Sequence, residues 1–153
     1  MVDVKTANDT ALDFERRYAA PQERVFRAWT DPAQIKSWWG KKNGFRLEDF
    51  VMELKPGGRF RMAMRSPENN LFVTSGRVRE ADAPRRVVYT WVWEEGDWKG
   101  IETLVTVDFR KDGDGTRVTV RHENFTDASA RDRHLGGWAT HSEGLEDYLN
   151  ANT

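Results

Sequence analysis

The order of the expected elements constrains this fold more than any other feature of the sequence. One alternating strand, Leu12 to Tyr18, is followed by two short helices that begin at Pro21 and Pro32. The second is expected to carry Ile35, Trp38 and Trp39 and to end at Gly40. From Phe45 the apolar pattern has a period of two, which predicts six further strands before a long helix that starts near residue 128. An antiparallel sheet must bury its apolar face, and the last helix is the element long enough to do so. We therefore predict an α+β fold with a curved sheet around that helix and a ligand cavity between them.

Composition excludes several classes of protein. The 153 residues include 24 Lys and Arg against 25 Asp and Glu, and this balance removes a global attraction to nucleic acid or anionic membranes. The absence of cysteine excludes disulfides, thiol catalysis and thiolate metal sites. No stretch approaches the roughly 18 apolar residues of a membrane span, and the start MVDVKTANDT lacks the apolar segment of a signal peptide. We expect a cytoplasmic protein without nucleic-acid or membrane partners, a flexible tail over residues 1–10, and a single domain over residues 11–153.

The strand pattern predicts one apolar and one charged face for the sheet. Phenylalanine and methionine alternate with arginine along Arg59–Arg65, whereas Arg86–Trp93 is apolar on both faces and is typical of a central strand covered on both sides. Asp112–Gly115 has the acidic spacing of a calcium loop, but Arg117 occupies the position that needs glycine, so a hairpin turn is predicted.

The C-terminal helix is predicted to be amphipathic. Gly136 and Gly137 disfavour helix by about 1 kcal/mol each relative to alanine, so they either kink the helix or let its backbone approach the sheet closely. Apolar residues recur beyond them at the spacing of one helix face. This stripe consists of Trp138, His141, Leu145, Tyr148 and Leu149.

Five phrases occur in a characteristic order along the chain. They are APQERVFRAWTDPAQIKSWWG, ELKPGGRFRM, GRVREADAPRRVVYTW, HENF and GGWATHSEGLEDYL. Together they resemble the Hsp90-ATPase-activator-homologue-1-like family, within the START-like (SRPBCC, helix-grip) superfamily, over about residues 12–150. The resemblance implies a helix-grip fold of β-α-α-β6-α order, in which a curved, antiparallel, seven-stranded sheet grips the C-terminal helix. The relatives that it implies include proteins that bind lipids, polyketides or hormones. The family takes its name from a eukaryotic co-chaperone domain.

The three histidines do not form a metal motif. His134 and His141 lie seven residues apart on one helix, or about 10.5 Å, which is too far for two ligands of one metal. His122 shares a strand face with two valines and should point inward, as a structural wall residue, a ligand contact or an acid–base catalyst. The motifs GxSxG and HExxH are absent. We expect no metal, no cofactor and no prosthetic group, and we assign no catalytic residue.

Large apolar side chains exceed what a small core usually needs. Some should line the cavity, with methionines as an adaptable wall and Tyr89, His122 and His141 as the polar groups that orient a ligand. The candidate ligand-binding residues are Trp39, Phe60, Met62, Met64, Phe72, Tyr89, Trp91, Phe109, His122, Trp138, His141 and Leu145.

The arginines of the strands present an alternative, an RNA-binding sheet. That function needs aromatic side chains on the same exposed face for base stacking, but the aromatic positions face the opposite way. We therefore expect a solvated face on which arginines pair with acidic neighbours. The arginines are Arg59, Arg61, Arg65, Arg77, Arg79, Arg85, Arg86, Arg117 and Arg121.

Three functional hypotheses follow from these observations. The first is binding of a small hydrophobic or aromatic molecule between the sheet and the C-terminal helix. The second is a co-chaperone-like module that uses an outer surface to bind another protein. The third is an enzyme of the cyclase or hydrolase type, which needs titratable groups with perturbed pKa values in the cavity. The sequence favours binding over catalysis, and the protein is expected to be a monomer or a homodimer.

Overall fold

The computed structural model describes residues 10–151, so nearly all of the tail expected over residues 1–10 lies outside the described residues. The described chain forms a seven-stranded sheet in the order β1-β7-β6-β5-β4-β3-β2, and each neighbouring pair is antiparallel. The predicted α+β architecture is confirmed. The elements are β1 (Ala11–Tyr18), α2 (Gln22–Thr30), α3 (Pro32–Ile35), the 3-10 turn η1 (Lys41–Asn43), β2 (Arg46–Met52), β3 (Arg59–Arg65), β4 (Leu71–Asp82), β5 (Arg86–Trp93), β6 (Glu102–Asp112), β7 (Gly115–Glu123) and α4 (Ala128–Ala151).

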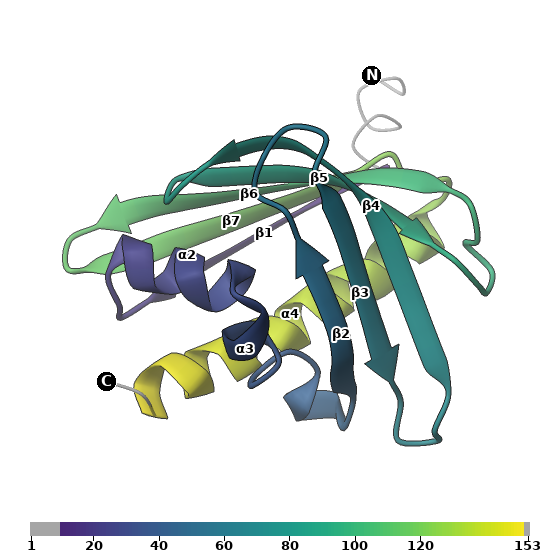
Figure 1. The fold of residues 1–153 in the computed structure, drawn as a ribbon, viewed down its shortest axis with the longest axis horizontal. Helices are drawn as coiled ribbons and strands as arrows, with labels where there is room; N and C mark the ends of the chain where they lie inside the picture. Colours follow the sequence, from purple (N-terminus) through teal and green to yellow (C-terminus); the bar gives the residue numbers. More distant parts are fainter. Residues whose placement is uncertain (1–9, 152–153) are drawn as a thin grey trace.

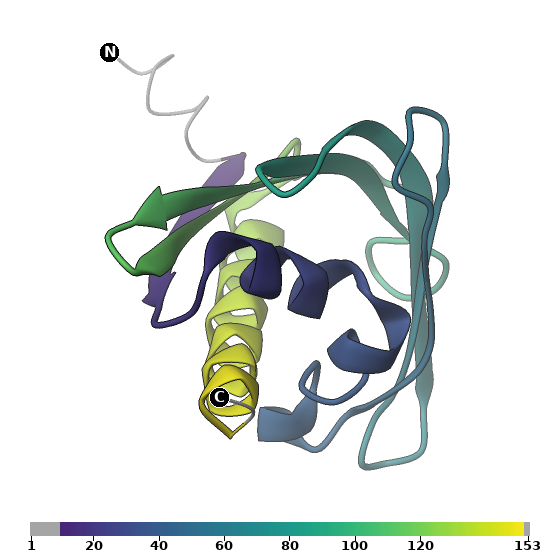
Figure 2. The same cartoon turned by 60° about the vertical axis from the view of Figure 1, so that its left-hand side comes forward.

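The sheet curves around the helices. Helix α4 runs along the concave side, and α2 and α3 lie at one end of the same side (Figure 1). Figure 2 shows how strongly the sheet bends, since β2, β3 and β4 form a wall that stands across from α4. All of the helices therefore lie on one side of the sheet, and the convex side carries none of the described helices.

The central strand β5 is buried on both faces, but not because a helix covers each face. Val88 and Thr90 on its convex side are buried although no described helix lies there. At Thr90 the neighbouring strand β4 approaches very closely, because a Cβ atom added to Gly76 would overlap the Thr90 carbonyl. The Thr90 hydroxyl also accepts a hydrogen bond from the Arg77 backbone N–H at 2.8 Å.

The second short helix is shorter than the sequence indicates. Helix α3 ends at Ile35, and turns lead to Gly40, whose φ is 80°. Trp38 and Trp39 are both buried, and adjacent positions of a regular helix point about 100° apart. Leaving the helix lets both indoles reach the interior, where Trp38 donates to the Ala28 carbonyl at 3.0 Å.

Helix α4 makes close contact with the turn around Trp38, which lies between α3 and η1. The contact is made by Gly144, a glycine that the sequence analysis did not single out. A Cβ atom added to Gly144 would lie 2.6 Å from the Trp38 carbonyl oxygen. A Cβ atom added to Gly136 or Gly137 would meet nothing within 4 Å. The alternative in which these two glycines let the backbone approach the sheet is therefore wrong, and α4 continues through them.

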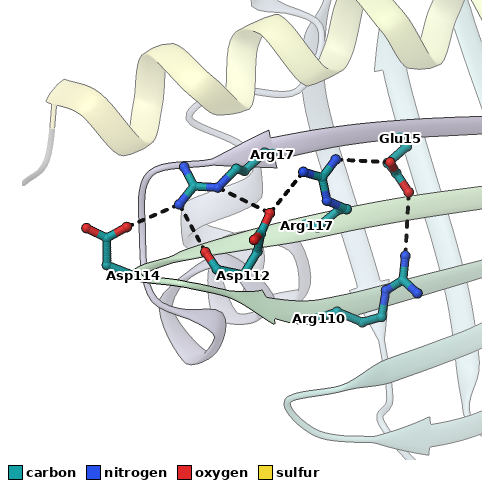
Figure 3. Close-up of polar contacts among 6 residues, drawn as sticks. All are labelled: Glu15, Arg17, Arg110, Asp112, Asp114 and Arg117. Atoms are coloured by element: carbon teal, nitrogen blue, oxygen red, sulfur yellow. Dashed lines mark hydrogen bonds and ion pairs between the residues drawn. The ribbon is translucent and has the colours of Figure 1, made fainter.

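The convex side carries paired charges. Figure 3 shows a chain of ion pairs along β1, β6 and β7, with N–O distances between 2.9 and 3.5 Å. The other arginines considered for RNA contact also have carboxylate partners, except Arg77, which donates to the Gly57 carbonyl. The expectation of arginines paired with acidic neighbours is confirmed for all of the arginines considered except Arg77. The residues in Figure 3 are, in order, Asp114, Arg17, Asp112, Arg117, Glu15 and Arg110.

The helices found in residues 10–151 are either too short or too polar to span a membrane.

Candidate functional site

A pocket of about 430 Å³ lies beside the N-terminal half of α4. Strands β3 and β5, the turn around η1 and the β5–β6 loop supply its other walls. The lining is dominated by aromatic side chains. The lining residues are Trp39, Asn43, Phe45, Met64, Trp91, Trp93, Trp98, Arg133, His134, Gly136, Gly137, Trp138, Thr140 and His141.

The pocket has a buried floor and a more exposed rim. The floor residues are the most buried members of the lining: Trp39 is 2%, Met64 5%, Trp91 4% and Trp138 4% exposed. Arg133 and Asn43 on the rim are exposed. A flat apolar molecule would therefore meet indole rings at depth and polar groups near its opening.

Six of the predicted ligand-binding residues lie at this pocket or beside it. Trp39, Met64, Trp91, Trp138 and His141 line the pocket itself. Phe72 is 39% exposed and lines an adjoining cavity of about 210 Å³, which shares Met64 and His141 with the main pocket.

The other six predicted residues belong to the packed core and do not line the pocket. Helix α2 explains this difference, because it places Phe26 and Trp29 against Phe109, with ring centroids 5.0 and 5.8 Å apart. The α2 end of the concave surface is thus filled, and the open space is displaced toward β3, β5 and the start of α4. Of the six residues, Phe109 lies under α2, His122 is buried behind the pocket floor, and Phe60, Met62, Tyr89 and Leu145 are buried elsewhere in the core.

Several lining residues were not predicted. Trp93 follows Trp91 on the same face of β5, so strand alternation was a signal that could have included it. No comparable signal marked Trp98 in the loop before β6, or Arg133 and His134 in the first turns of α4. The unpredicted lining residues are Asn43, Phe45, Trp93, Trp98, Arg133, His134, Gly136, Gly137 and Thr140.

His122 is buried behind the floor, and both of its ring nitrogens are hydrogen-bonded. Trp138 Nε1–H donates to His122 Nδ1 at 3.1 Å, which requires that Nδ1 carry no proton. His122 Nε2 therefore carries the proton and donates to the Thr103 hydroxyl at 2.7 Å, which in turn donates to the Trp91 carbonyl at 2.9 Å. Burial lowers the pKa of His122 well below its ordinary value, which keeps this ring neutral.

His134 is held in the opposite tautomer. Its Nδ1–H donates to the Ala130 carbonyl at 2.7 Å, and its Nε2 accepts from Trp93 Nε1 at 2.9 Å. Burial lowers its pKa, and the positive charge of Arg133 lowers it further. Both ring nitrogens of His134 are thus hydrogen-bonded to protein groups. On the pocket wall His134 can contact a ligand through the face of its ring but has no free hydrogen-bonding group.

His141 differs from the other two histidines. Its ring stacks on Trp39 with centroids 4.0 Å apart, and its Nδ1 accepts from the Gly40 backbone N–H at 3.2 Å. Burial lowers the pKa of His141 to about 4, so the ring is neutral at pH 7 and Nε2 carries its proton. This Nε2–H has no acceptor among residues 10–151 but is not closed off from solvent.

The side chains of the lining determine what chemistry the pocket offers. No carboxylate is part of the lining, and the described residues contain no cluster of three His, Asp or Glu side chains suited to hold a metal ion. Of the lining histidines, His134 has both nitrogens engaged and His141 retains one free N–H. The geometry therefore offers apolar surface and hydrogen-bond donors.

The curved antiparallel sheet, the long helix gripped against it and the pocket between them define the helix-grip (START-like) class of fold. The chain belongs to the family of Activator of Hsp90 ATPase homolog 1-like proteins, which it matches over residues 19–150. The resemblance inferred from the five sequence phrases is confirmed.

Solved structures of bacterial proteins share this fold. A protein of this family from Silicibacter pomeroyi is 25% identical, with a TM-score of 0.83 over 94% of this chain and 99% of that chain. A protein from Rhodobacter sphaeroides is 26% identical, with a TM-score of 0.80 over 94% of both chains. CalU16 from Micromonospora echinospora is 24% identical, with a TM-score of 0.69 over 91% of this chain and 75% of that one, and supports the fold alone. No curated protein matches the chain.

Proposed function

We propose that the protein binds a small hydrophobic, aromatic molecule in the pocket between α4 and the sheet. The observation that carries this proposal is an open pocket of about 430 Å³ whose floor is built from three indoles and a methionine. Ligand sites in proteins typically enclose about 300–1,000 Å³ and combine apolar walls with a few polar groups. Met64 adds an adaptable side chain to the rigid rings around it.

Hydrogen bonds within the protein fix two of the floor indoles, which favours a preformed site. The Nε1–H groups of Trp39 and Trp138 donate to Met64 Sδ at 3.0 Å and to His122 Nδ1 at 3.1 Å. These bonds hold two floor rings in place without a ligand. A preformed pocket binds more tightly because less conformational entropy is lost on binding.

The other two hypotheses receive less support from this geometry. An enzyme of the cyclase or hydrolase type needs convergent acid and base groups, and the lining supplies one imidazole N–H with no carboxylate nearby in the described lining. A co-chaperone-like interaction module rests on the family name. The cytoplasmic location and the single domain over residues 11–153 remain predictions from the sequence.

Titration with N-phenyl-1-naphthylamine, a neutral and apolar fluorescent probe, tests the proposal. We expect micromolar affinity, quenching of tryptophan fluorescence by the bound probe, and a rise in melting temperature with probe concentration. Gly137→Leu should abolish binding, because the pocket lies where the new side chain would extend. Glu143→Leu is the matched control, since it adds the same side chain to an exposed position of α4 outside the pocket and should bind normally.

Equal binding by the two variants would place the probe elsewhere and contradict the proposal. A probe that neither binds nor shifts the melting temperature would also contradict it, and would leave the co-chaperone-like interaction module as the better hypothesis.

A further inference from the structure

One floor tryptophan has an unused hydrogen-bond donor. The Nε1–H of Trp91 is buried and has no hydrogen-bond partner. The neighbouring lining residues differ, because Trp39, Trp93 and Trp138 each donate to a protein acceptor at 2.9 to 3.1 Å. A buried indole N–H normally has a partner, and leaving it without one costs about 1–3 kcal/mol. Because the N–H is closed off from solvent, a bound molecule can supply the acceptor only where a neighbouring side chain shifts to admit it, and that hydrogen bond would remove this cost.

Other donors on the side chains of the pocket lining also lack protein acceptors among residues 10–151. His141 offers its Nε2–H, because Nδ1 is occupied by the Gly40 N–H. Arg133 has no carboxylate partner among residues 10–151, and its guanidinium lies 5.1 Å from the ring centroid of Trp98. The planar ring of Trp98 attracts this cation but does not neutralise its charge.

The side-chain acceptors of the pocket are few and uncharged. No carboxylate lines it, and the acceptors are the Asn43 amide oxygen and the Thr140 hydroxyl oxygen, whose proton is directed to the Gly136 carbonyl at 3.0 Å. The pocket therefore presents a surplus of donors and one unpaired positive charge. A complementary ligand must bring acceptors and negative charge.

We infer that the natural ligand is a flat aromatic molecule that carries an anionic oxygen acceptor, such as a carboxylate. This inference rests on the proposed function and specifies its ligand class. The aromatic body lies against the floor rings, and an acceptor oxygen takes the Trp91 N–H. The negative charge lies nearer the rim beside Arg133, where it retains part of its hydration and avoids the full cost of burial.

Naphthalene and three of its derivatives separate these contributions. The probes are 2-naphthoate, 2-acetylnaphthalene, naphthalene and 2-naphthylmethylammonium, with affinities measured by displacement of N-phenyl-1-naphthylamine and by ligand-observed NMR. We expect 2-naphthoate to bind about tenfold more tightly than naphthalene, with 2-acetylnaphthalene between them and the cation weakest.

Two variants assign the preference to named groups. Trp91→Phe keeps an aromatic floor but removes the N–H, so 2-acetylnaphthalene should lose its advantage over naphthalene. Arg133→Gln should reduce binding of 2-naphthoate and leave the two neutral probes unchanged. Trp38→Phe is the control, because Trp38 lies outside the pocket lining and its N–H already donates to the Ala28 carbonyl, so its loss should not change the order of the probes.

The outcomes distinguish this inference from the proposed function. If naphthalene and the cation bind as tightly as 2-naphthoate, the pocket binds ligands but the inferred ligand class is wrong. If the preference for 2-naphthoate persists unchanged in both Trp91→Phe and Arg133→Gln, the donors named here are wrong. If none of the four probes binds, the proposed function itself is contradicted.

Discussion

Trp138 on α4 donates its indole N–H to Nδ1 of His122 on β7, at 3.1 Å. This bond begins a relay that continues through the Thr103 hydroxyl to the Trp91 carbonyl. The relay therefore connects α4 with β7, β6 and β5, and two of its four members are floor residues of the pocket. The position of the helix and the shape of the floor depend on the same buried contacts.

The first prediction concerns the Trp138 side chain. Trp138→Ala should reduce the free energy of unfolding by about 3–5 kcal/mol, the usual cost of deleting a large buried aromatic side chain. Trp138→Phe keeps a ring but leaves the His122 Nδ1 without its donor, and should cost about 1–3 kcal/mol. Urea denaturation measures both values. An unchanged midpoint for Trp138→Ala would show that α4 does not dock on the sheet at this residue.

A double-mutant cycle isolates the hydrogen bond from the loss of packing. The variants are Trp138→Phe, His122→Phe and the pair together. Because the two side chains are in direct contact, their effects should be non-additive by about 0.5–3 kcal/mol. Additive losses would indicate that the bond contributes little to stability.

The second prediction compares glycines on one helix. Gly136→Ala should stabilise the protein by about 0.5–1 kcal/mol, because alanine favours helix and its Cβ meets open space. Gly144→Ala should destabilise it by about 1–3 kcal/mol, since its Cβ would be forced against the Trp38 carbonyl. Thermal unfolding of the two variants provides the measurement, and changes of the same sign would contradict the packing described above.

The third prediction is a loss of stability in mild acid. Burial lowers the pKa values of His122, His134 and His141 in the folded protein, whereas in the unfolded chain histidines titrate near 6.5. Below about pH 6.5 the unfolded chain therefore binds more protons than the folded one, so stability is full above this pH and falls as the pH decreases toward the folded values. Each neutral histidine contributes a slope of at most about 1.4 kcal/mol per pH unit.

Urea midpoints between about pH 7.5 and pH 5.5 measure this slope. Arginine and backbone hydrogen bonds lower the pKa values of Glu48, Glu53 and Asp82, so these carboxylates titrate below the window. His141→Phe should flatten the slope, because the variant keeps a ring over Trp39 but cannot titrate. A flat profile for the unmodified protein would mean that its histidines ionise as easily in the folded state as in the unfolded one.

The fourth prediction concerns the charges in Figure 3. Arg117→Gln removes contacts to Asp112 and Glu15, but its side chain is 39% exposed and the pairs are screened by solvent. We expect a loss of less than about 1 kcal/mol, which becomes smaller still at high salt. Chemical denaturation at low and high salt tests this expectation, and a large, salt-independent loss would assign these ion pairs a structural role.

Much of the fold could be read from local patterns. The alternation along β3 and β7 depends on residues two positions apart, so it identified the buried faces of both strands, including His122. The stripe on α4 likewise predicted the burial of Trp138, Leu145 and Leu149. The end of α3 was misjudged, because the burial of two adjacent indoles depends on where α4 and the sheet lie and not on the sequence around them.

The sequence by itself determined the element order, the strand faces, the apolar stripe of α4 and the family. The tertiary structure decided which part of the concave surface stays open, since α2 fills the space over Phe109 and leaves the space beside Trp91 and Trp39. It also decided that the indole N–H of Trp138 has a hydrogen-bond partner and that of Trp91 has none. The physical reason is that periodicity acts between neighbours in the chain, whereas cavities and buried hydrogen bonds depend on side chains that meet from distant elements.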